Sequence, residues 1–424
     1  MRTVSRLAAV VAVLSASGAS CAAPGQHSVP RVGAAAVGLP VETAPPNVPA
    51  FKPAFAGQTR ALGIATKTPL AVDVIAHGFD KPWALAFLPD GQMLVTEKPT
   101  GKLFVVNRDG KKSLPVTGVP AVDGRDQCGL LDVKLGPDFA SSGLVYLSYC
   151  EPRKGGNGLA VARGRFTNGE GPKLDGVQVV FRMEPTLDSS MQPGGPLIFT
   201  PDGKLFVTLG DRIIAEGRAQ ARDPSSDIGK IVRIAPDGSI PKDNPFVGKS
   251  GARPEIWSMG HRNIIAAALD GKARLWIVEM GPRGGDELNL IQPGKDYGWP
   301  TIGYGEEYSG APIHETTQAP GLEQPVYYWD PVIAPSGLTI YTGSLFPEWK
   351  GSYLIGGLAV ESLVRLVVKG DKVTGEERLL TDRHERIRDV VQGPDGAVYL
   401  LTDDTDGELL RVSPATAKTA AKGK

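Results

Sequence analysis

The sequence has no excess of charge of either sign. Lysine plus arginine and aspartate plus glutamate both total 46 in 424 residues, so the formal net charge at pH 7 is zero and the pI is near 7.0. Nucleic-acid binding depends on a positive field that holds the phosphate groups. We therefore expect no nucleic-acid partner.

The sequence also lacks any long hydrophobic run beyond its first residues. There, Arg2 and Arg6 are followed by a short apolar run and then by small residues, a pattern typical of an export signal. The run is too short to span a bilayer. We predict a signal peptide over residues 1–21 and a periplasmic or secreted protein. Cys21 is a candidate lipoprotein acceptor, with ordinary cleavage near the same point as the alternative, so membrane association is expected only through a lipid anchor.

Cysteine is scarce, with three residues in the whole chain. If Cys21 is removed or lipidated, Cys128 and Cys150 remain as a pair in an oxidising compartment. Segments 131–135 and 144–149 are predicted to be antiparallel neighbours, and this pairing places Cys150 within reach of Cys128. The sequence thus predicts a disulfide, with two buried free thiols as the alternative.

No long run has helical periodicity, whereas turn-forming residues are abundant. The 53 glycines and 36 prolines make up about a fifth of the chain, against roughly 12% in average proteins. This composition favours many short strands over helices. Residues 22–62, rich in Pro, Ala, Val and Gly, are interpreted as a flexible linker. Residues 414–424 are interpreted as a loose tail, which leaves residues 63–413 as one domain.

Within that domain a turn of the Pro-Asp-Gly type, followed by a β-rich run, recurs six times at spacings of roughly 50 to 70 residues. The copies are residues 89–91, 137–139, 201–203, 270–271, 346–348 and 394–396. Each is a tight turn joining two strands of a sheet. Six in series predict an all-β fold, a six-bladed β-propeller. Propellers gather loops at one end of a central channel, where we expect the functional site.

Several segments are more specific than the repeat. They are residues 127–133, 229–234, 237–245, 260–263, 281–291, 296–300 and 386–390. In this order, across about residues 70–413, they resemble the soluble glucose and aldose sugar dehydrogenases that use pyrroloquinoline quinone (PQQ) and calcium. The resemblance implies a quinoprotein that oxidises the C1 hydroxyl of an aldose by hydride transfer to PQQ. The electrons would pass to an external acceptor.

The chemistry of PQQ agrees with this resemblance. Its three carboxylates and ortho-quinone require guanidinium and amide donors. Arg386 and Arg388 alternate on a strand-like segment, which places both on one face. The resemblance implies that they bind the carboxylates, while Gln127, Arg262 and Asn263 contact the quinone side. The alternatives are a solvated strand face for the first pair and a loop salt bridge for Arg262.

The resemblance also implies calcium. The backbone carbonyls of Gly281 and Pro282 would hold an ion that binds PQQ as well. Calcium accepts main-chain carbonyls as ligands, so no acidic cluster is required. Glu287 and the carbonyl of Tyr297 match a second, structural calcium site in some relatives. The alternative for residues 281–282 is a simple turn.

One position departs from the family. Gln192 stands where relatives carry the histidine that removes the proton of the sugar hydroxyl, and Pro196 replaces an arginine. A neutral amide cannot accept a proton near pH 7. Asp211, which matches the acid that orients this histidine, is retained. The lysine with which the family neutralises PQQ falls at Ala359.

Several explanations of Gln192 remain open. His384 or His314 could serve as a shifted base, or the protein could be a slow or differently selective dehydrogenase. A degenerate propeller could bind PQQ, a sugar or a protein without turnover. A calcium-dependent lactonase-type hydrolase would need carboxylate ligands converging on the channel, which the sequence does not identify. A general base contributes roughly 10²–10⁴ in rate, so its loss need not abolish activity. The favoured interpretation is a PQQ- and calcium-dependent aldose dehydrogenase.

Overall fold

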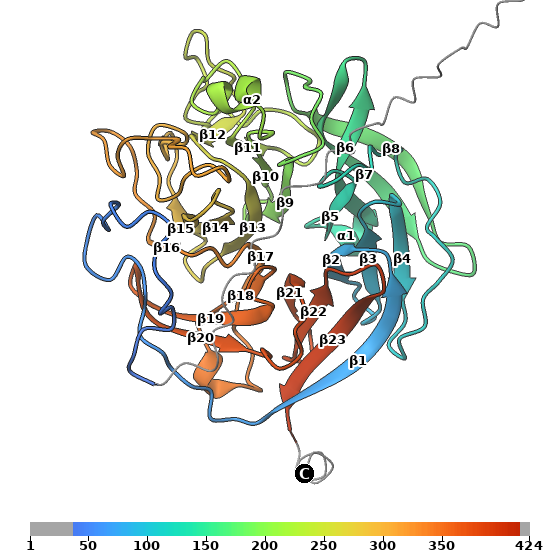
Figure 1. Ribbon diagram of the computed structural model, residues 1–424. Coiled ribbons are helices and arrows are strands. Elements are labelled where there is room, and N and C mark those ends of the chain that lie inside the picture. Colours follow the sequence, from blue (N-terminus) through green and yellow to red (C-terminus); the bar gives the residue numbers. More distant parts are fainter. Residues whose placement is uncertain (1–36, 416–424) are drawn as a thin grey trace, which may run out of the picture.

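The computed structural model describes residues 37–415, which form six antiparallel sheets around a central axis (Figure 1). Five sheets have four strands and one has three. This confirms the predicted all-β fold and the six-bladed β-propeller. Within the described residues, no helix is long and apolar enough to cross a membrane.

The strands follow one another around the ring in chain order. The first blade contains β2 (Pro82–Phe87), β3 (Met93–Glu97) and β4 (Lys102–Val106). The second contains β5 (Leu130–Leu135), β6 (Leu144–Arg153), β7 (Gly156–Thr167) and β8 (Lys173–Arg182). The third contains β9 (Gly194–Phe199), β10 (Leu205–Leu209), β11 (Lys230–Ile234) and β12 (Ile256–Met259). The fourth blade contains β13 (Ile264–Leu269), β14 (Leu275–Glu279), β15 (Asp286–Ile291) and β16 (Tyr327–Trp329). The fifth contains β17 (Pro335–Ile340), β18 (Tyr353–Gly357), β19 (Ser362–Lys369) and β20 (Lys372–Leu379). The sixth contains β21 (Ile387–Gln392), β22 (Val398–Thr402) and β23 (Gly407–Pro414) together with β1 (Leu70–Phe79).

Between residues 37 and 415, helical segments are few and short. They are α1 (Phe139–Ser142), α2 (Ala215–Gln220) and the 3₁₀ helix η1 (Pro347–Trp349).

The ring closes through its two chain ends. Strand β1 pairs with β23 from Leu70 opposite Pro414 to Phe79 opposite Gly407. In Figure 1 the blue β1 therefore lies along the red β23, and the last blade contains strands from both ends of the domain. Each first strand also contacts the first strand of the next blade, so these six strands line the axis.

Two buried aspartates link neighbouring inner strands in the same way. Asp132 on β5 accepts a hydrogen bond at 2.8 Å from the backbone N–H of Leu197 on β9. Asp389 on β21 accepts one at 2.9 Å from Leu85 on β2. The carboxylates thereby satisfy N–H groups of the next blade, where the apolar core between the sheets offers no other partner.

The six repeated turns all connect the first and second strands of a blade. They therefore lie on one face of the propeller. The beginnings of the first strands and the ends of the second strands lie on the opposite face. This second face carries the predicted site residues.

Residues 37–62 differ from the predicted flexible linker, because they pack against the fourth and fifth blades. Glu42 forms a buried ion pair with Arg378 on β20 at 3.0 Å. The backbone N–H of Asn47 donates to Asp330 at 2.9 Å. Gln58 is fully buried. We call residues 37–62 the N-terminal strap. The predicted signal with Cys21, the rest of the linker and most of the tail lie outside the described residues.

Candidate functional site

The predicted site residues meet on one face of the propeller and come from four blades. Most of them fall either at the beginning of a first strand or just after a second strand; Glu287 on β15 and Tyr297 in the connection after it do not. Gln127 precedes β5, Gln192 precedes β9, Arg262 and Asn263 precede β13, and Arg386 and Arg388 are at the beginning of β21; Asp211 follows β10, and Gly281 and Pro282 follow β14. The propeller therefore brings together residues separated by up to 261 positions in the chain.

Gln192 lies at the centre of the first group. Its side chain is buried, and its backbone N–H donates to Gln127 Oε1 at 2.9 Å. The side-chain amide lies between Asp211 and Arg262. With its oxygen toward Arg262 it accepts a hydrogen bond from Nη2 at 2.8 Å, while its nitrogen donates to Asp211 Oδ1. Gln192, which the sequence resemblance places at the family base position, is thus in direct contact with Gln127, Asp211 and Arg262.

Asp211 is fully buried and surrounded by N–H donors. Besides Gln192, it accepts hydrogen bonds from the backbone of Ile213 at 2.8 Å and from Trp299 Nε1 at 2.7 Å. Burial raises the pKa of its carboxyl group, and the positive charge of Arg262 opposes this effect. The carboxyl group therefore lies where it would orient either the present amide or an imidazole at position 192.

Arg262 joins this group to the loop after β14. Its Nη1 donates to the carbonyls of Met280 and Gly281, both at 2.7 Å. Its guanidinium lies over Trp299, 5.4 Å from the ring centroid, and its buried Nε has no protein partner. Next to it, Asn263 Oδ1 accepts a hydrogen bond from the N–H of Gly194 at 3.3 Å. Arg262 is therefore fixed in orientation, and one of its buried donors remains without a partner in the protein.

Arg386 and Arg388 form the second group, and both point toward one carboxylate, as their alternation on the strand predicted. Arg386 Nη2 lies 2.8 Å from Asp403 Oδ2, and Arg388 Nη2 lies 2.9 Å from Asp403 Oδ1. Burial opposes ionisation of Asp403, but Arg388 and Arg386 hold its pKa well below its usual range. The Arg386 side chain is 37% exposed. Two guanidinium groups share one carboxylate, so the pair keeps an excess of positive charge.

The interpretation of the sequence missed three residues of this face: Lys98, Trp299 and Asp403. A signal for two of them was present in the repeat. Lys98 and Asp403 each follow the glycine of their blade's turn by seven residues, and Asp211 follows its own by eight. A residue seven or eight positions after the glycine of a turn therefore lies at the end of the second strand, on the face that carries the site. Trp299 had no such signal, because it lies in the long connection between β15 and β16.

The predicted calcium ligands line one pocket beside Arg262. Its walls include Gly281, Pro282, Glu287 and Tyr297. The carbonyl of Gly281 already accepts a hydrogen bond from Arg262, but a carbonyl oxygen has two lone pairs and can also bind a cation. These residues therefore fit the ligand type of calcium.

Two carboxylates face each other in this pocket. Glu287 lies opposite Glu279 in the pairing of β15 with β14. Burial and the charge of Glu279 raise the pKa of Glu287 to about 8. Asn289 Nδ2 donates to Glu279 at 3.2 Å and to Glu287 at 2.9 Å, and its buried Oδ1 has no partner. A cation between Glu279 and Glu287 would relieve their repulsion. Among the described residues, no three His, Cys, Asp or Glu side chains are grouped as metal ligands.

Neither candidate for a shifted base is hydrogen-bonded to Gln192 or Asp211. His314 is buried in the same pocket, stacks on Phe51 of the N-terminal strap at 5.4 Å, and has its pKa lowered to about 4 by burial. His384 is exposed on the loop between β20 and β21. His314 therefore contacts the strap and its own loop, and His384 faces solvent.

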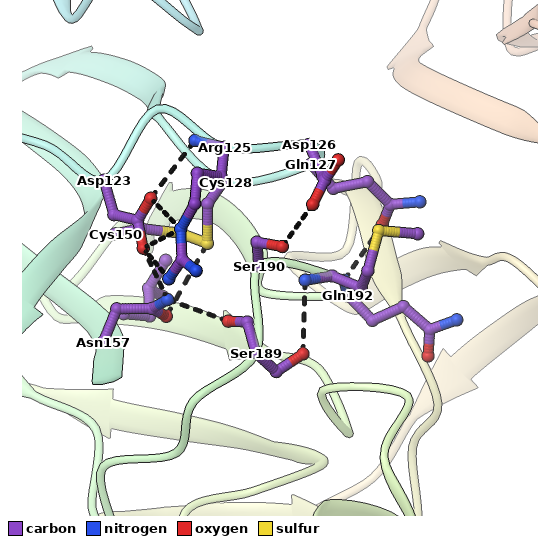
Figure 2. Close-up of a disulfide and its surroundings, with 12 residues drawn as sticks. Asp123, Arg125, Asp126, Gln127, Cys128, Cys150, Asn157, Ser189, Ser190 and Gln192 are labelled. Carbon is purple, nitrogen blue, oxygen red and sulfur yellow. Dashed lines mark hydrogen bonds and ion pairs between the residues drawn. A yellow bond between two sulfur atoms is a disulfide. The ribbon is translucent and has the colours of Figure 1, made fainter. Parts of the chain in front are cut away.

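The structure joins Cys128 and Cys150 in a disulfide beside the site (Figure 2), with Cα atoms 5.5 Å apart. The backbone N–H groups of Gln127 and Cys128 both donate to the carbonyl of Ser190, at 3.1 and 3.0 Å. Ser190 lies two residues before Gln192. The disulfide thus holds the segment that contacts the Gln192 loop.

We expect loss of this disulfide to destabilise the fold. The two cysteines are separated by 22 residues. For a loop of this size, the chain-entropy model gives about 3 kcal/mol. Replacing both cysteines with serine should lower the free energy of unfolding by about this amount in urea titrations. Alkylation of the unreduced, unfolded wild type should label neither cysteine. Two labelled thiols, or an unchanged unfolding midpoint in the variant, would contradict the expectation.

Comparison with known proteins places this site in a family. The model of the "Glucose / Sorbosone dehydrogenase" family matches residues 79–411, most of the chain. The chain belongs to this family. Its similarity to the aldose sugar dehydrogenase YliI of Escherichia coli is 45% identity over 347 residues, 81% of this chain and 92% of that protein.

Solved structures agree with this membership. The apo-form crystal structure of the soluble aldose sugar dehydrogenase from Escherichia coli is 44% identical, with a TM-score of 0.78 over 82% of this chain and 100% of that one. The PQQ-bound aldose sugar dehydrogenase from Streptomyces coelicolor is 29% identical, with a TM-score of 0.67 over 82% and 99% of the chains. These two solved relatives are aldose sugar dehydrogenases.

Proposed function

We propose that the protein is a PQQ- and calcium-dependent dehydrogenase that oxidises an aldose at C1. The observation that carries the proposal is that Arg386 and Arg388 of the sixth blade and Arg262 and Asn263 of the fourth blade lie on the same face of the propeller, because PQQ needs carboxylate-binding cations on one side and donors for its quinone on the other. The PQQ-bound relative supports the choice of cofactor.

The residues of the site then have separate roles. Arg386 and Arg388 bind carboxylates, and Gln127, Arg262 and Asn263 hold the quinone side. Calcium would be held by the carbonyls of Gly281 and Pro282, and a second ion by Glu287 and the carbonyl of Tyr297. When bound, PQQ supplies the two-electron acceptor of the reaction, and calcium polarises its carbonyl.

Oxidation of the sugar requires two transfers. The sugar loses a hydride from C1 and a proton from the C1 hydroxyl and becomes a lactone. Bound PQQ would supply the acceptor for the hydride, an external acceptor would take up the two electrons, and this chain must provide a path for the proton. Gln192 is hydrogen-bonded between Asp211 and Arg262 and can orient the hydroxyl, but it cannot take the proton. We therefore propose that the proton passes to solvent and that this step limits the rate.

A second function is supported by the same residue. Without an imidazole beside Asp211, the propeller could bind PQQ or a sugar and catalyse no turnover. The two functions differ in a measurable way, because both require cofactor binding and only one requires oxidation.

We also propose that the protein is exported to the periplasm or secreted, with Cys21 as a candidate lipid anchor. The Cys128–Cys150 disulfide supports this proposal, because disulfides persist in oxidising compartments.

Reconstitution tests the proposed function. The purified protein is loaded with calcium and PQQ and screened against aldoses with a dye as electron acceptor. We expect dye reduction that depends on the sugar and on PQQ and that is lost when a chelator removes calcium. Calcium-dependent PQQ binding with no dye reduction by any aldose would favour the binding function.

A further inference from the structure

A further cationic side chain, Lys98, lies on the site face of the first blade. Lys98 follows β3, and its side chain is nearly buried. Its Nζ donates a hydrogen bond to the carbonyl of Asp126, the residue before Gln127. Its backbone oxygen accepts a hydrogen bond from the N–H of Leu130 at 3.0 Å. The amine is therefore held between the end of β3 and the segment that carries Gln127.

The surroundings of Lys98 leave little freedom. Gly129 has a φ of 145°, and a Cβ atom at this position would lie 2.7 Å from Lys98 Cγ and 2.0 Å from its carbonyl oxygen. No larger residue fits there without a shift of the backbone. The backbone at Gly129 therefore packs directly against Lys98, and the hydrogen bond to Asp126 fixes the position of its amine.

The charges around Lys98 do not balance within the protein. Burial and the positive charge of Arg388 lower its pKa to about 8, Lys81 acts in the same direction, and Asp403 and Asp126 oppose them. Asp403 is already shared by Arg386 and Arg388. A buried amine near the guanidinium group of Arg388 is costly unless a further anion compensates it. Such groups are typical of ligand sites.

We propose that Lys98 binds a carboxylate of PQQ and supplies, from the first blade, the positive charge that position 359 lacks. Ala359 adjoins Leu358, whose carbonyl accepts a hydrogen bond from Arg386 at 3.0 Å, so the missing charge belongs to the same cluster. This inference rests on the proposed function and adds a cofactor-binding residue to it.

The role of Lys98 has a signature in pH. An anion bound beside the amine raises the pKa of Lys98 above its value of about 8 in the unliganded protein. Between these two pKa values, binding takes up a proton. The affinity for PQQ should therefore be constant below pH 8 and fall as the pH rises beyond it, by up to tenfold per unit.

Titration of the calcium-loaded protein with PQQ, followed by fluorescence quenching, tests the proposal with three variants. Lys98→Met should weaken binding at pH 7 by at least about tenfold, the lower end for hydrogen bonds to charged groups. Lys98→Arg should restore the affinity and remove the decline above pH 8, because arginine stays charged. Lys204→Met, beside a turn on the opposite face, should bind as the wild type does.

A purely structural role for Lys98 predicts a different result, in which Lys98→Arg keeps the pH dependence of the wild type. That result, or equal affinity in Lys98→Met and wild type, would overturn the proposal. Should Lys98→Met fail to fold, the pH profiles of PQQ affinity in wild type and Lys98→Arg still distinguish cofactor binding by Lys98 from a purely structural role.

A second probe separates this proposal from the proposed function. Benzene-1,2,4-tricarboxylate has three carboxylates and no quinone. If the wild type binds it and Lys98→Met does not, while PQQ does not bind, the anion site stands and the PQQ function fails. If neither compound binds the wild type, the role of Lys98 is overturned as well.

Discussion

Gln192→His should raise aldose oxidation by the calcium- and PQQ-loaded protein at least about tenfold, a conservative part of the roughly 10²–10⁴ that a general base contributes. The present amide contacts both Asp211 and Arg262. An imidazole at this position would find the buried carboxyl group of Asp211, which would fix its tautomer and increase its basicity. The measurement is kcat with a saturating dye acceptor.

A matched control is Gln192→Asn, which keeps an amide and should give no increase. Pro196 lies in β9, at the position where the resemblance to the family implies arginine, and a displacement of about 1 Å can cost roughly a hundredfold in rate. Gln192→His is therefore also measured with Pro196→Arg. A wild type that already turns over quickly, and that Gln192→His slows, would place the base elsewhere, with the exposed His384 as the next candidate.

Arg388→Ala should weaken PQQ binding by about 1.5–3 kcal/mol, the range for hydrogen bonds to charged groups. From the sequence, this arginine is expected mainly to bind a carboxylate of PQQ. In the structure it also pairs with Asp403 at 2.9 Å, so part of the effect will come from the release of that carboxylate. Titration with PQQ gives the change in affinity, and thermal unfolding of the apo protein gives the change in stability.

Arg411→Ala is the matched control for Arg388→Ala. Arg411 also pairs with an aspartate, Asp395, which lies in the repeated turn on the opposite face, and it has a longer contact of 3.9 Å with Asp73. Its removal should leave PQQ affinity unchanged. Equal titration curves for Arg388→Ala and wild type would remove Arg388 from the cofactor site.

The sequence predicted the propeller because each blade repeats one local pattern. The turn at residues 201–203 and the strand after it carry their signal in adjacent residues, and six copies of that signal define the ring. The residues of the Gln192 network could be identified from the sequence for a different reason. Its members were identified by resemblance to a family, and their joint placement follows from the register of the blades.

The N-terminal strap shows that local sequence signals do not predict contacts between residues far apart in the chain. Its residues look like a linker by composition, but Glu42 pairs with Arg378 and Phe51 stacks on His314, far away in the chain. Lys98 was missed for a related reason. Its significance depends on Arg388 and Asp403, which lie on another blade, and only the folded ring brings their charges together.

One measurement tests the central claim most directly. Excess aldose is added, without oxygen or any other acceptor, to the calcium-loaded protein carrying one equivalent of PQQ, and the absorption of the bound cofactor is followed. We expect the spectrum to change fully from that of the oxidised to that of the reduced form, slowly in the wild type and faster in Gln192→His. A bound cofactor whose spectrum stays oxidised in both proteins with every aldose tested would contradict the assignment as a dehydrogenase.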